Sequence, residues 1–222
     1  MLDTRIGAIF DWDGVVIDSS TLHEKSWDRL AAETGFALPP GHFKKGFGMK
    51  NVFIIPKILK WTESPDEVRK LSLRKEELYR ELVISHGIAP LPGVTALLDE
   101  LAGHGIPCAI GSSTERLNIE TILKVLGFER YFSAIVSADD VSHGKPDPEV
   151  FLTAAVRIAR EPRHCVVFED ALVGIEAAHR GGMKVVAVAT TNPIEAIGIA
   201  DIAVHRLDEL SVARLSALFS VE

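Results

Sequence analysis

Six short apolar runs recur along the chain, and each has the length of a β-strand. Apolar residues fill these runs without alternation, a pattern typical of strands covered on both faces in a parallel sheet. The runs span residues 6–10, 107–111, 133–136, 165–168, 184–188 and, least distinctly, 201–204. We therefore predict a sheet of buried, parallel strands.

Helical patterns fill the gaps between most of these runs. Apolar residues recur at helical spacing over residues 94–102 and 117–126, and each segment stops at a glycine. A third helix is predicted from Pro148 to residue 159 with Asp147 as its N-cap, and a fourth over residues 171–180. This alternation of strands and helices predicts a doubly wound α/β fold.

One stretch after the first strand breaks the alternation, because it contains helical patterns and no convincing strand. Amphipathic segments occur at residues 21–34, at 51–61 with Pro56 as a dividing residue, and at 65–85 with Ser64 as N-cap and Pro65 next. We predict an α/β core made of residues 1–18 and 87–222. Residues 19–86 would form a smaller, all-helical domain inserted after the first strand.

Composition and charge narrow the class of protein. The chain has 222 residues, of which 47% are hydrophobic and 25% charged, and its formal charge is −7, so it can bury a core and is a poor candidate for binding nucleic acid or an anionic membrane surface. No apolar run is long enough to cross a bilayer, and no signal peptide is visible. Both cysteines, Cys108 and Cys165, lie in apolar strand-like runs, which favours reduced, buried thiols. We expect a soluble, cytoplasmic protein that is a monomer or homodimer.

Two acidic pairs are the strongest chemical signal. Asp11 and Asp13 follow the first apolar run, and Gly14 allows a tight turn there; Glu169 and Asp170 follow the fourth run. Taken singly, the first pair could be a surface turn and the second a helix cap. Two such pairs at the ends of buried strands indicate a shared site, because ligands collect at the carboxyl ends of parallel strands. Buried carboxylates that converge favour a hard divalent cation such as Mg²⁺.

Two further loops suit an anion. Ser112 and Ser113, followed by Thr114, link the second apolar run to a helix, where hydroxyl and main-chain N–H groups can bind phosphate. Lys145 lies in a proline-rich loop before another helix and could neutralise the same anion. The alternatives are ordinary helix capping for the hydroxyl residues and a solvated surface charge for the lysine.

In this order, the four segments resemble the motifs of the haloacid dehalogenase-like superfamily. Asp11-Trp12-Asp13-Gly14-Val15 matches the first motif, Ser112 the second, Lys145-Pro146 the third and Glu169-Asp170, with Gly174-Ile175, the fourth. Each motif is weak alone, but the ordered set is specific and covers almost the whole chain. The helical insertion resembles the cap of the subgroup that contains β-phosphoglucomutase and many sugar-phosphate phosphatases.

The resemblance implies a role for each motif residue. Asp11 would be the nucleophile that forms an aspartyl-phosphate, and Asp13 the general acid and base. Mg²⁺ would be held by Asp11 and Asp170, together with the main-chain carbonyl of Asp13, and Glu169 would either bind the metal directly or support its ligands. Ser112, Ser113 and Lys145 would bind the transferring phosphate, and closure of the cap would exclude water. Asp13 favours transfer of a phosphoryl group, because dehalogenases proper lack this second aspartate.

The cap should read the rest of a small phosphorylated metabolite, with a sugar phosphate as the best expectation. Four candidates are His23, Lys50, Lys75 and Arg116, although each could equally be a packing or surface residue. Lys50 lies where the mutase has an arginine for a second phosphate, and Glu115 next to Arg116 would repel such a group. A phosphatase is therefore the leading hypothesis. A phosphosugar mutase and a non-catalytic phosphometabolite-binding regulator are the alternatives.

Overall fold

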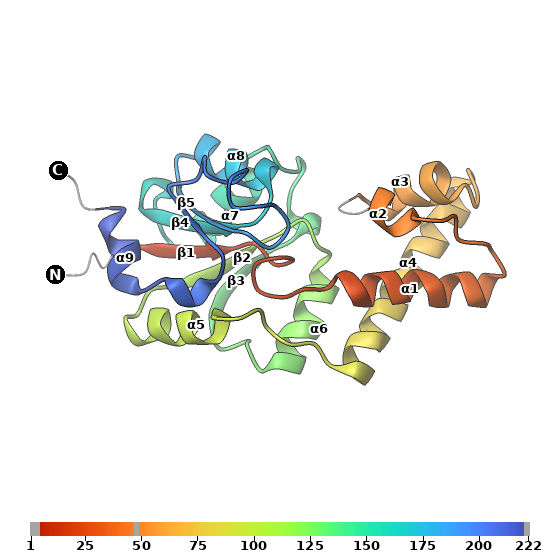
Figure 1. The fold of residues 1–222 in the computed structure, drawn as a ribbon, viewed down its shortest axis with the longest axis horizontal. Coiled ribbons are helices and arrows are strands. Elements are labelled where there is room, and N and C mark those ends of the chain that lie inside the picture. The colour runs from red at the N-terminus through yellow and green to blue at the C-terminus, as the bar shows by residue number, and fades with distance from the viewer. Residues whose placement is uncertain (1–4, 47–48, 220–222) are drawn as a thin grey trace. The chain divides into compact units, whose positions relative to one another are not determined.

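A parallel sheet of six strands organises the α/β part of the chain (Figure 1). The computed structural model describes residues 5–46 and 49–219. The strands are β1 (Gly7–Phe10), β2 (Cys108–Gly111), β3 (Phe132–Val136), β4 (Cys165–Glu169), β5 (Lys184–Val188) and β6 (Ile202–Val204), in the spatial order β3-β2-β1-β4-β5-β6. All six predicted apolar runs are strands, and the predicted doubly wound α/β class is confirmed.

This strand order fixes where a site can form. The chain leaves β1 toward β2 on one side, and later returns to β4 on the other side of β1. In folds of this type, ligands bind at the carboxyl ends of the strands where the strand order reverses, which here are β1 and β4. Phe10 is paired with Phe168 and with Ile110, so the residues that follow β1, β2 and β4 lie at one edge of the sheet.

Helices cover both faces of the sheet. Figure 1 shows α5 (Val94–Gly103) and α6 (Arg116–Leu126) on the side opposite α7 (Glu149–Arg157) and α8 (Leu172–Arg180). Residues of α7 and α8, such as Phe151 and Ile175, pack with Ile9 and Val167 of the central strands. Short elements complete this unit: the 3₁₀ helices Ala138–Asp140, Pro162–His164 and Leu207–Glu209, and α9 (Val212–Ala217).

The predicted helix start at Ser64 and Pro65 is confirmed, whereas the start near Asp147 differs in detail from the observed one. The N-cap of α7 is Pro148, but the side chain of Asp147 still accepts a hydrogen bond from the main chain of Glu149 at 3.0 Å. Ser64 is the N-cap of α4 without a capping hydrogen bond from its side chain, and Pro65 begins the helix. Proline suits the first helical position because its missing N–H would have no intrahelical partner there.

The chain separates into two compact units, one made of Met1–Asp18 with Ile88–Glu222 and the other of Ser19–Gly87. The second unit contains α1 (Ser20–Thr34), α2 (His42–Gly46), α3 (Asn51–Phe53), a π-helical segment (Ile54–Leu59) and α4 (Pro65–His86). Its core includes Trp27, Leu30 and Ile55. Pro56 lies inside the π-helical segment, two residues after the helix type changes at Ile54, so the helical region changes type near this proline but does not end at it. The short α2 was not predicted.

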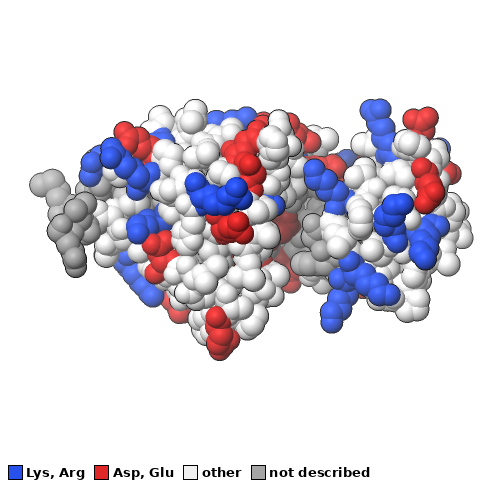
Figure 2. Space-filling view, turned by 90° about the horizontal axis from the view of Figure 1, so that it is seen from above, with Lys and Arg blue, Asp and Glu red and all other residues white. Residues whose placement is uncertain are grey.

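Charge differs slightly between the two units. Residues 19–88 contain 12 Lys and Arg against 9 Asp and Glu. Figure 2 shows mainly basic side chains on the visible face of the helical unit and both signs interspersed on the α/β unit.

No described helix is long and apolar enough to cross a membrane. Cys108 and Cys165 are buried free thiols, and burial raises the pKa of each to about 12.

Close packing between α7 and the sheet generates a stability prediction. A Cβ atom at Gly111 would lie 3.0 Å from Cδ1 of Phe151 and 3.2 Å from Cγ2 of Ile9. We expect Gly111→Ala to lower the free energy of unfolding by about 1–3 kcal/mol through overpacking, measured by urea denaturation.

Gly103 provides the matched control, because it lies in α5 and nothing lies within 4 Å of the position of its Cβ. Gly103→Ala should leave stability unchanged or raise it by up to about 1 kcal/mol, as alanine is the better helix former. Equal stability of Gly111→Ala and the wild type would contradict the packing described here.

Candidate active site

Three buried carboxylates meet at the reversal point of the sheet. Asp11 follows β1, Glu169 ends β4, and Asp170 comes next in the chain. The main-chain N–H of Asp11 donates to the carbonyl of Phe168 at 2.9 Å, which fixes the end of β1 beside the end of β4. One oxygen from each of the three carboxylates lies within 4.8 Å of the other two. The sheet register therefore brings Asp11 together with Glu169 and Asp170, which are far from it in the sequence.

Lys145 supplies positive charge to this cluster. Its Nζ atom lies 2.9 Å from Oδ1 of Asp11 and 2.5 Å from Oε1 of Glu169, and its side chain is only 7% exposed. Burial acts to lower the pKa of Lys145, but the Asp11 and Glu169 carboxylates outweigh it and raise that pKa above its ordinary value. Lys145 is consequently a buried ammonium group, and the alternative of a solvated surface lysine does not describe its position.

Glu169 is fixed by the first turn after β4. Its Oε2 atom accepts hydrogen bonds from the main-chain N–H groups of Asp170 and Ala171, both at 2.8 Å. A Cβ atom on Gly174 would overlap the carboxylate of Glu169, so only glycine leaves room for it. Close packing against the Glu169 carboxylate thus explains why a glycine occupies position 174 of the fourth motif.

Asp170 is held by a segment that the sequence did not identify. Thr191, which follows β5, donates from Oγ1 to Oδ2 of Asp170, and Asn192 donates from Nδ2 to the main-chain carbonyl of Asp170 at 2.9 Å. A Cβ on Gly14 would overlap the Asp170 carboxylate, and Gly14 has a φ of 79°, which favours glycine. The signal in the sequence was the polar triplet 190–192 directly after the fifth apolar run.

Asp13 and the loop after β2 form the adjoining part of the site. The hydroxyl of Thr114 donates to Oδ2 of Asp13 at 2.5 Å, and the main-chain N–H of Thr114 donates to Oγ of Ser112 at 3.2 Å. Ser112 is buried directly after β2, whereas Ser113 is exposed. Asp13 and Ser112 therefore both contact Thr114. The catalytic and phosphate-binding roles of Asp13, Ser112 and Ser113 stay predictions.

Trp12, between the two aspartates, is a packing residue. It is fully buried and lies edge to face with Phe132 of β3, with 6.3 Å between ring centroids. The side chain therefore helps to anchor the acidic turn on the sheet.

The acidic cluster fits a divalent cation. Burial, reinforced by the charges of Asp11 and Glu169, raises the pKa of Asp170 to about 7. Burial is also the main cause that raises the pKa of Glu169, while Lys145 opposes it and Asp11 adds to it. Like charges buried at this distance disfavour the ionised forms, and a hard cation with oxygen ligands would remove that penalty. Asp11, Glu169 and Asp170 are the carboxylates that would hold it.

The helical unit has its own buried polar cluster, which contains two predicted substrate residues. Nζ of Lys75 lies 2.6 Å from Nδ1 of His23 and 2.9 Å from Oε1 of Glu76, and that same oxygen accepts from Asn51 at 2.7 Å. His23 stacks on Tyr79 with 3.8 Å between ring centroids. Burial and the Lys75 ammonium lower the pKa of His23 to about 3, against an opposing effect of Glu76, so the imidazole is neutral at pH 7.

In Glu76, burial acts to raise the pKa, but the Lys75 ammonium and the other groups around the carboxylate, including the Asn51 amide, together outweigh it and lower the pKa to about 2. Lys75 thus has an ionised partner inside the unit. Lys50 does not join this cluster: it is exposed at the N-cap of α3, where its main-chain carbonyl accepts from the N–H groups of Phe53 and Ile54. Among the described residues its side chain makes no hydrogen bond or ion pair. The segment compared with the mutase arginine includes Phe47 and Gly48, which lie outside the described residues.

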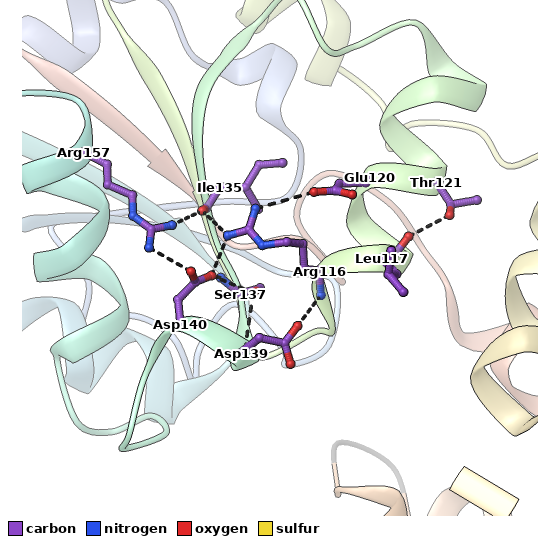
Figure 3. A network of polar contacts seen from close by, with 9 residues as sticks. All are labelled: Arg116, Leu117, Glu120, Thr121, Ile135, Ser137, Asp139, Asp140 and Arg157. Atoms are coloured by element: carbon purple, nitrogen blue, oxygen red, sulfur yellow. Dashed lines mark hydrogen bonds and ion pairs between the residues drawn. The ribbon is translucent and has the colours of Figure 1, made fainter. Parts of the chain in front are cut away.

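Arg116, the fourth predicted substrate residue, belongs to a polar network at the edge of the sheet (Figure 3). Its Nη2 atom donates to Oδ2 of Asp140 at 2.7 Å and to the main-chain carbonyl of Ile135 at 3.0 Å, and Glu120 lies 3.6 Å from Nη1. Arg157 binds the other oxygen of Asp140 at 2.8 Å. The structure thus gives Arg116 a role in joining α6 to the turn after β3, and its substrate role stays a prediction.

The comparisons with known proteins agree with this fold. The sequence profile of the haloacid dehalogenase-like hydrolases matches residues 8–188, and the chain belongs to this family. The chain is 41% identical over 216 residues to a chloroplastic 5-amino-6-(5-phospho-D-ribitylamino)uracil phosphatase of Arabidopsis thaliana, covering 96% of this chain and 57% of that relative. It is 34% identical to a fructose-1-phosphate phosphatase of Escherichia coli, covering 85% of this chain and 98% of that relative.

Among solved structures, β-phosphoglucomutase from Clostridium difficile is similar, with a TM-score of 0.79, 26% identity and 96% of each chain covered. The predicted superfamily and subgroup are therefore confirmed. Family membership, together with relatives named as phosphatases, defines the chain as a phosphoric monoester hydrolase.

The Asp140 network generates a pH-dependent prediction. Burial acts to raise the pKa of Asp140, but hydrogen bonds from Arg157, Ser137 and Arg116 outweigh it and hold the pKa well below its ordinary value. A carboxylate with a lowered folded-state pKa stabilises the fold above its unfolded pKa, and loses that effect as the pH falls through the folded pKa. We expect Asp140→Asn to cost about 1–3 kcal/mol at pH 7. The deficit should shrink below pH 3.8, the ordinary value for this group.

Urea unfolding of both proteins from pH 7 to pH 3 measures this difference. Asp208→Asn is the control, because Asp208 pairs with Arg206 and both side chains are largely exposed. Such a pair contributes about 0–1 kcal/mol. A deficit for Asp140→Asn that is absent at pH 7, or that grows on acidification, would contradict the role given to Asp140.

Proposed function

We propose that this protein is a Mg²⁺-dependent phosphatase that acts through an aspartyl-phosphate. Its substrate would be a small phosphorylated metabolite, in particular a sugar phosphate. The observation that carries the proposal is the buried cluster of Asp11, Glu169 and Asp170 beside the Lys145 ammonium. Three carboxylates and one ammonium give the cluster a negative charge, which favours binding of a divalent cation. The cation and Lys145 together can then balance the charge of a phosphate dianion.

Two displacements at phosphorus account for the reaction. A carboxylate oxygen of Asp11 attacks phosphorus, and the bond from phosphorus to the alcohol oxygen breaks while Asp13 gives that oxygen a proton. Asp13 then takes a proton from water as the water oxygen attacks phosphorus, which releases inorganic phosphate and restores Asp11. When bound, Mg²⁺ supplies charge neutralisation between the anionic nucleophile and the anionic substrate.

The neighbouring residues have supporting tasks. Lys145 lies 2.9 Å from Oδ1 of Asp11, so its charge is available where charge on the transferring phosphate must be balanced. Ser112, buried at the end of β2, would offer its hydroxyl and Ser113 its main-chain N–H to the same phosphate. Thr114 fixes one oxygen of Asp13 and thereby limits the rotation of the proposed general acid and base.

The cationic residues favour hydrolysis over a mutase reaction. A mutase must hold a bisphosphate intermediate, and Lys50, Lys75 and Arg116 were the candidates for its second phosphate. Asp140 neutralises Arg116 at 2.7 Å, and Glu76 neutralises Lys75 at 2.9 Å. Neither residue provides an unbalanced positive charge, and Lys50 lacks the bidentate geometry of arginine. The intact catalytic set also argues against a non-catalytic binding protein.

The relatives support the substrate class. The names of two of them specify a phosphorylated ribityl chain and a phosphorylated ketose, and both substrates are polyhydroxylated carbon chains with a phosphate monoester. The neutral His23, with Nδ1 facing Lys75, is a suitable hydrogen-bonding group for a hydroxyl. The cytoplasmic location, the oligomeric state and the expected lack of nucleic-acid or membrane partners stay predictions.

A phosphate-release assay tests this proposal. Wild-type protein with Mg²⁺ should release stoichiometric inorganic phosphate from at least one sugar or sugar-alcohol phosphate in a panel that also contains nucleotides and phosphoglycolate. EDTA should abolish release, and added Mg²⁺ should restore it. Asp11→Asn should reduce turnover by at least about 1,000-fold, because an amide oxygen is a poor nucleophile.

Conversion of β-glucose 1-phosphate is followed separately in the presence of the bisphosphate primer. Glucose 6-phosphate with little free phosphate would show the mutase reaction and contradict the hydrolytic proposal. Release of phosphate that persists in EDTA, or at the wild-type rate in Asp11→Asn, would contradict the metal-dependent and covalent parts of it.

A further inference from the structure

The segment after β5 reaches across to the acidic residue that ends the fourth motif. We infer that Thr191, assisted by Asn192, is a positioning residue that orients Asp170 for the divalent cation. The inference rests on the proposed function, because it assigns Thr191 a task only if Asp170 is a metal ligand. It adds the end of β5 to a site otherwise built from Lys145 and from the residues after β1, β2 and β4.

Hydrogen bonds tie Asp170 at both its side chain and its main chain. Thr191 donates from Oγ1 to Oδ2 of Asp170, and Asn192 donates from Nδ2 to the main-chain carbonyl at 2.9 Å. Thr190 adds a contact to the same side-chain oxygen at 3.5 Å, and donates to the carbonyl of Gly14 at 2.5 Å. The triplet therefore connects the turn after β1 with the turn after β4.

The charges around Asp170 explain why such a tether is needed. Asp170 lies beside the carboxylates of Asp11 and Glu169, which repel it, whereas the ion pairs of Lys145 are made with those two residues. Without a donor on Oδ2, rotation of the Asp170 side chain away from its neighbours would relieve the repulsion. Thr191 opposes that rotation.

The donor on Oδ2 is a neutral hydroxyl, and this matters for metal binding. A lysine or arginine there would orient Asp170 equally well, but its positive charge would compete with the cation. A hydroxyl fixes the carboxylate and leaves its negative charge for the metal. Glycine at position 14 leaves room for this contact, since a Cβ there would lie 3.2 Å from Oγ1 of Thr191 and would overlap Asp170.

The test measures Mn²⁺ binding by electron paramagnetic resonance on the full chain, without substrate. Thr191→Val keeps the shape of the side chain and removes the hydroxyl, so the Mn²⁺ dissociation constant should rise about 10- to 100-fold, as for other residues that orient metal ligands. Thr191→Ser retains the donor and should stay near the wild type. In turnover assays, Thr191→Val should need more Mg²⁺ for half-maximal rate and recover most of kcat at saturating Mg²⁺.

Thr121→Val is the matched control, because the Thr121 hydroxyl binds only the main chain of Leu117 within α6 (Figure 3). It should leave Mn²⁺ affinity unchanged. Asn192→Ala removes the second tether and should also weaken Mn²⁺ binding, which keeps the inference testable if Thr191→Val does not fold.

The outcomes separate the inference from the function on which it rests. If folded Thr191→Val binds Mn²⁺ with wild-type affinity, the positioning role is overturned and the proposed metal site stays intact. If Thr191→Val does not fold, the same result in Asn192→Ala overturns the role. A wild-type chain that binds no Mn²⁺ would overturn both. Weaker binding in Thr191→Val that Thr191→Ser does not share would support the inference.

Discussion

The structure depends on one electrostatic constraint, which is the burial of several carboxylates at a single edge of the sheet. Asp11, Glu169 and Asp170 offer oxygens within 4.8 Å of one another, and all three residues are buried. Burial, together with the charges of neighbouring carboxylates, disfavours the ionised state of Glu169 and Asp170 and raises the pKa of each. Lys145 balances part of this charge, and a divalent cation would balance the rest.

The fold meets this constraint through main-chain and neutral donors as well as through opposite charge. Two N–H groups hold Glu169, a hydroxyl holds Asp170, and another hydroxyl holds Asp13. Two glycines, Gly14 and Gly174, leave the volume that the carboxylates occupy. The cluster is consequently oriented before any ligand binds, which is the condition for efficient electrostatic stabilisation of a transition state.

Local pattern was sufficient to predict the strands and the acidic part of the site. All six apolar runs are strands, because an uninterrupted apolar run suits a strand covered on both faces, and the acidic pairs lie directly at strand ends. The ordered set of four motifs then identified the family before any distance was known. The buried ion pairs of Lys145 follow from the same topology, since the loop that contains Lys145 precedes α7 on the adjoining face.

Contacts between distant segments were beyond the reach of sequence pattern. Thr191 meets Asp170 only because β5 lies beside β4, and a polar triplet after a strand does not by itself specify a partner. Arg116 was a substrate candidate by position, but Asp140, 24 residues further along, already binds its guanidinium. Lys75 meets His23, which lies 52 residues before it, and its neighbour Glu76, whose carboxylate also accepts from the distant Asn51. Periodicity reports which face of an element is buried, and it contains no information on these pairings.

Reductive trapping of the enzyme during turnover tests the central claim most directly. Borohydride reduces an acyl phosphate to an alcohol, so a nucleophilic aspartate is recovered as homoserine and located by peptide mass spectrometry. The account predicts homoserine in place of Asp11 when Mg²⁺ and a substrate are present, and unmodified Asp11 when either is left out. Unmodified Asp11 during turnover, together with inversion of configuration at phosphorus, would mean that water attacks the substrate directly and would contradict the account.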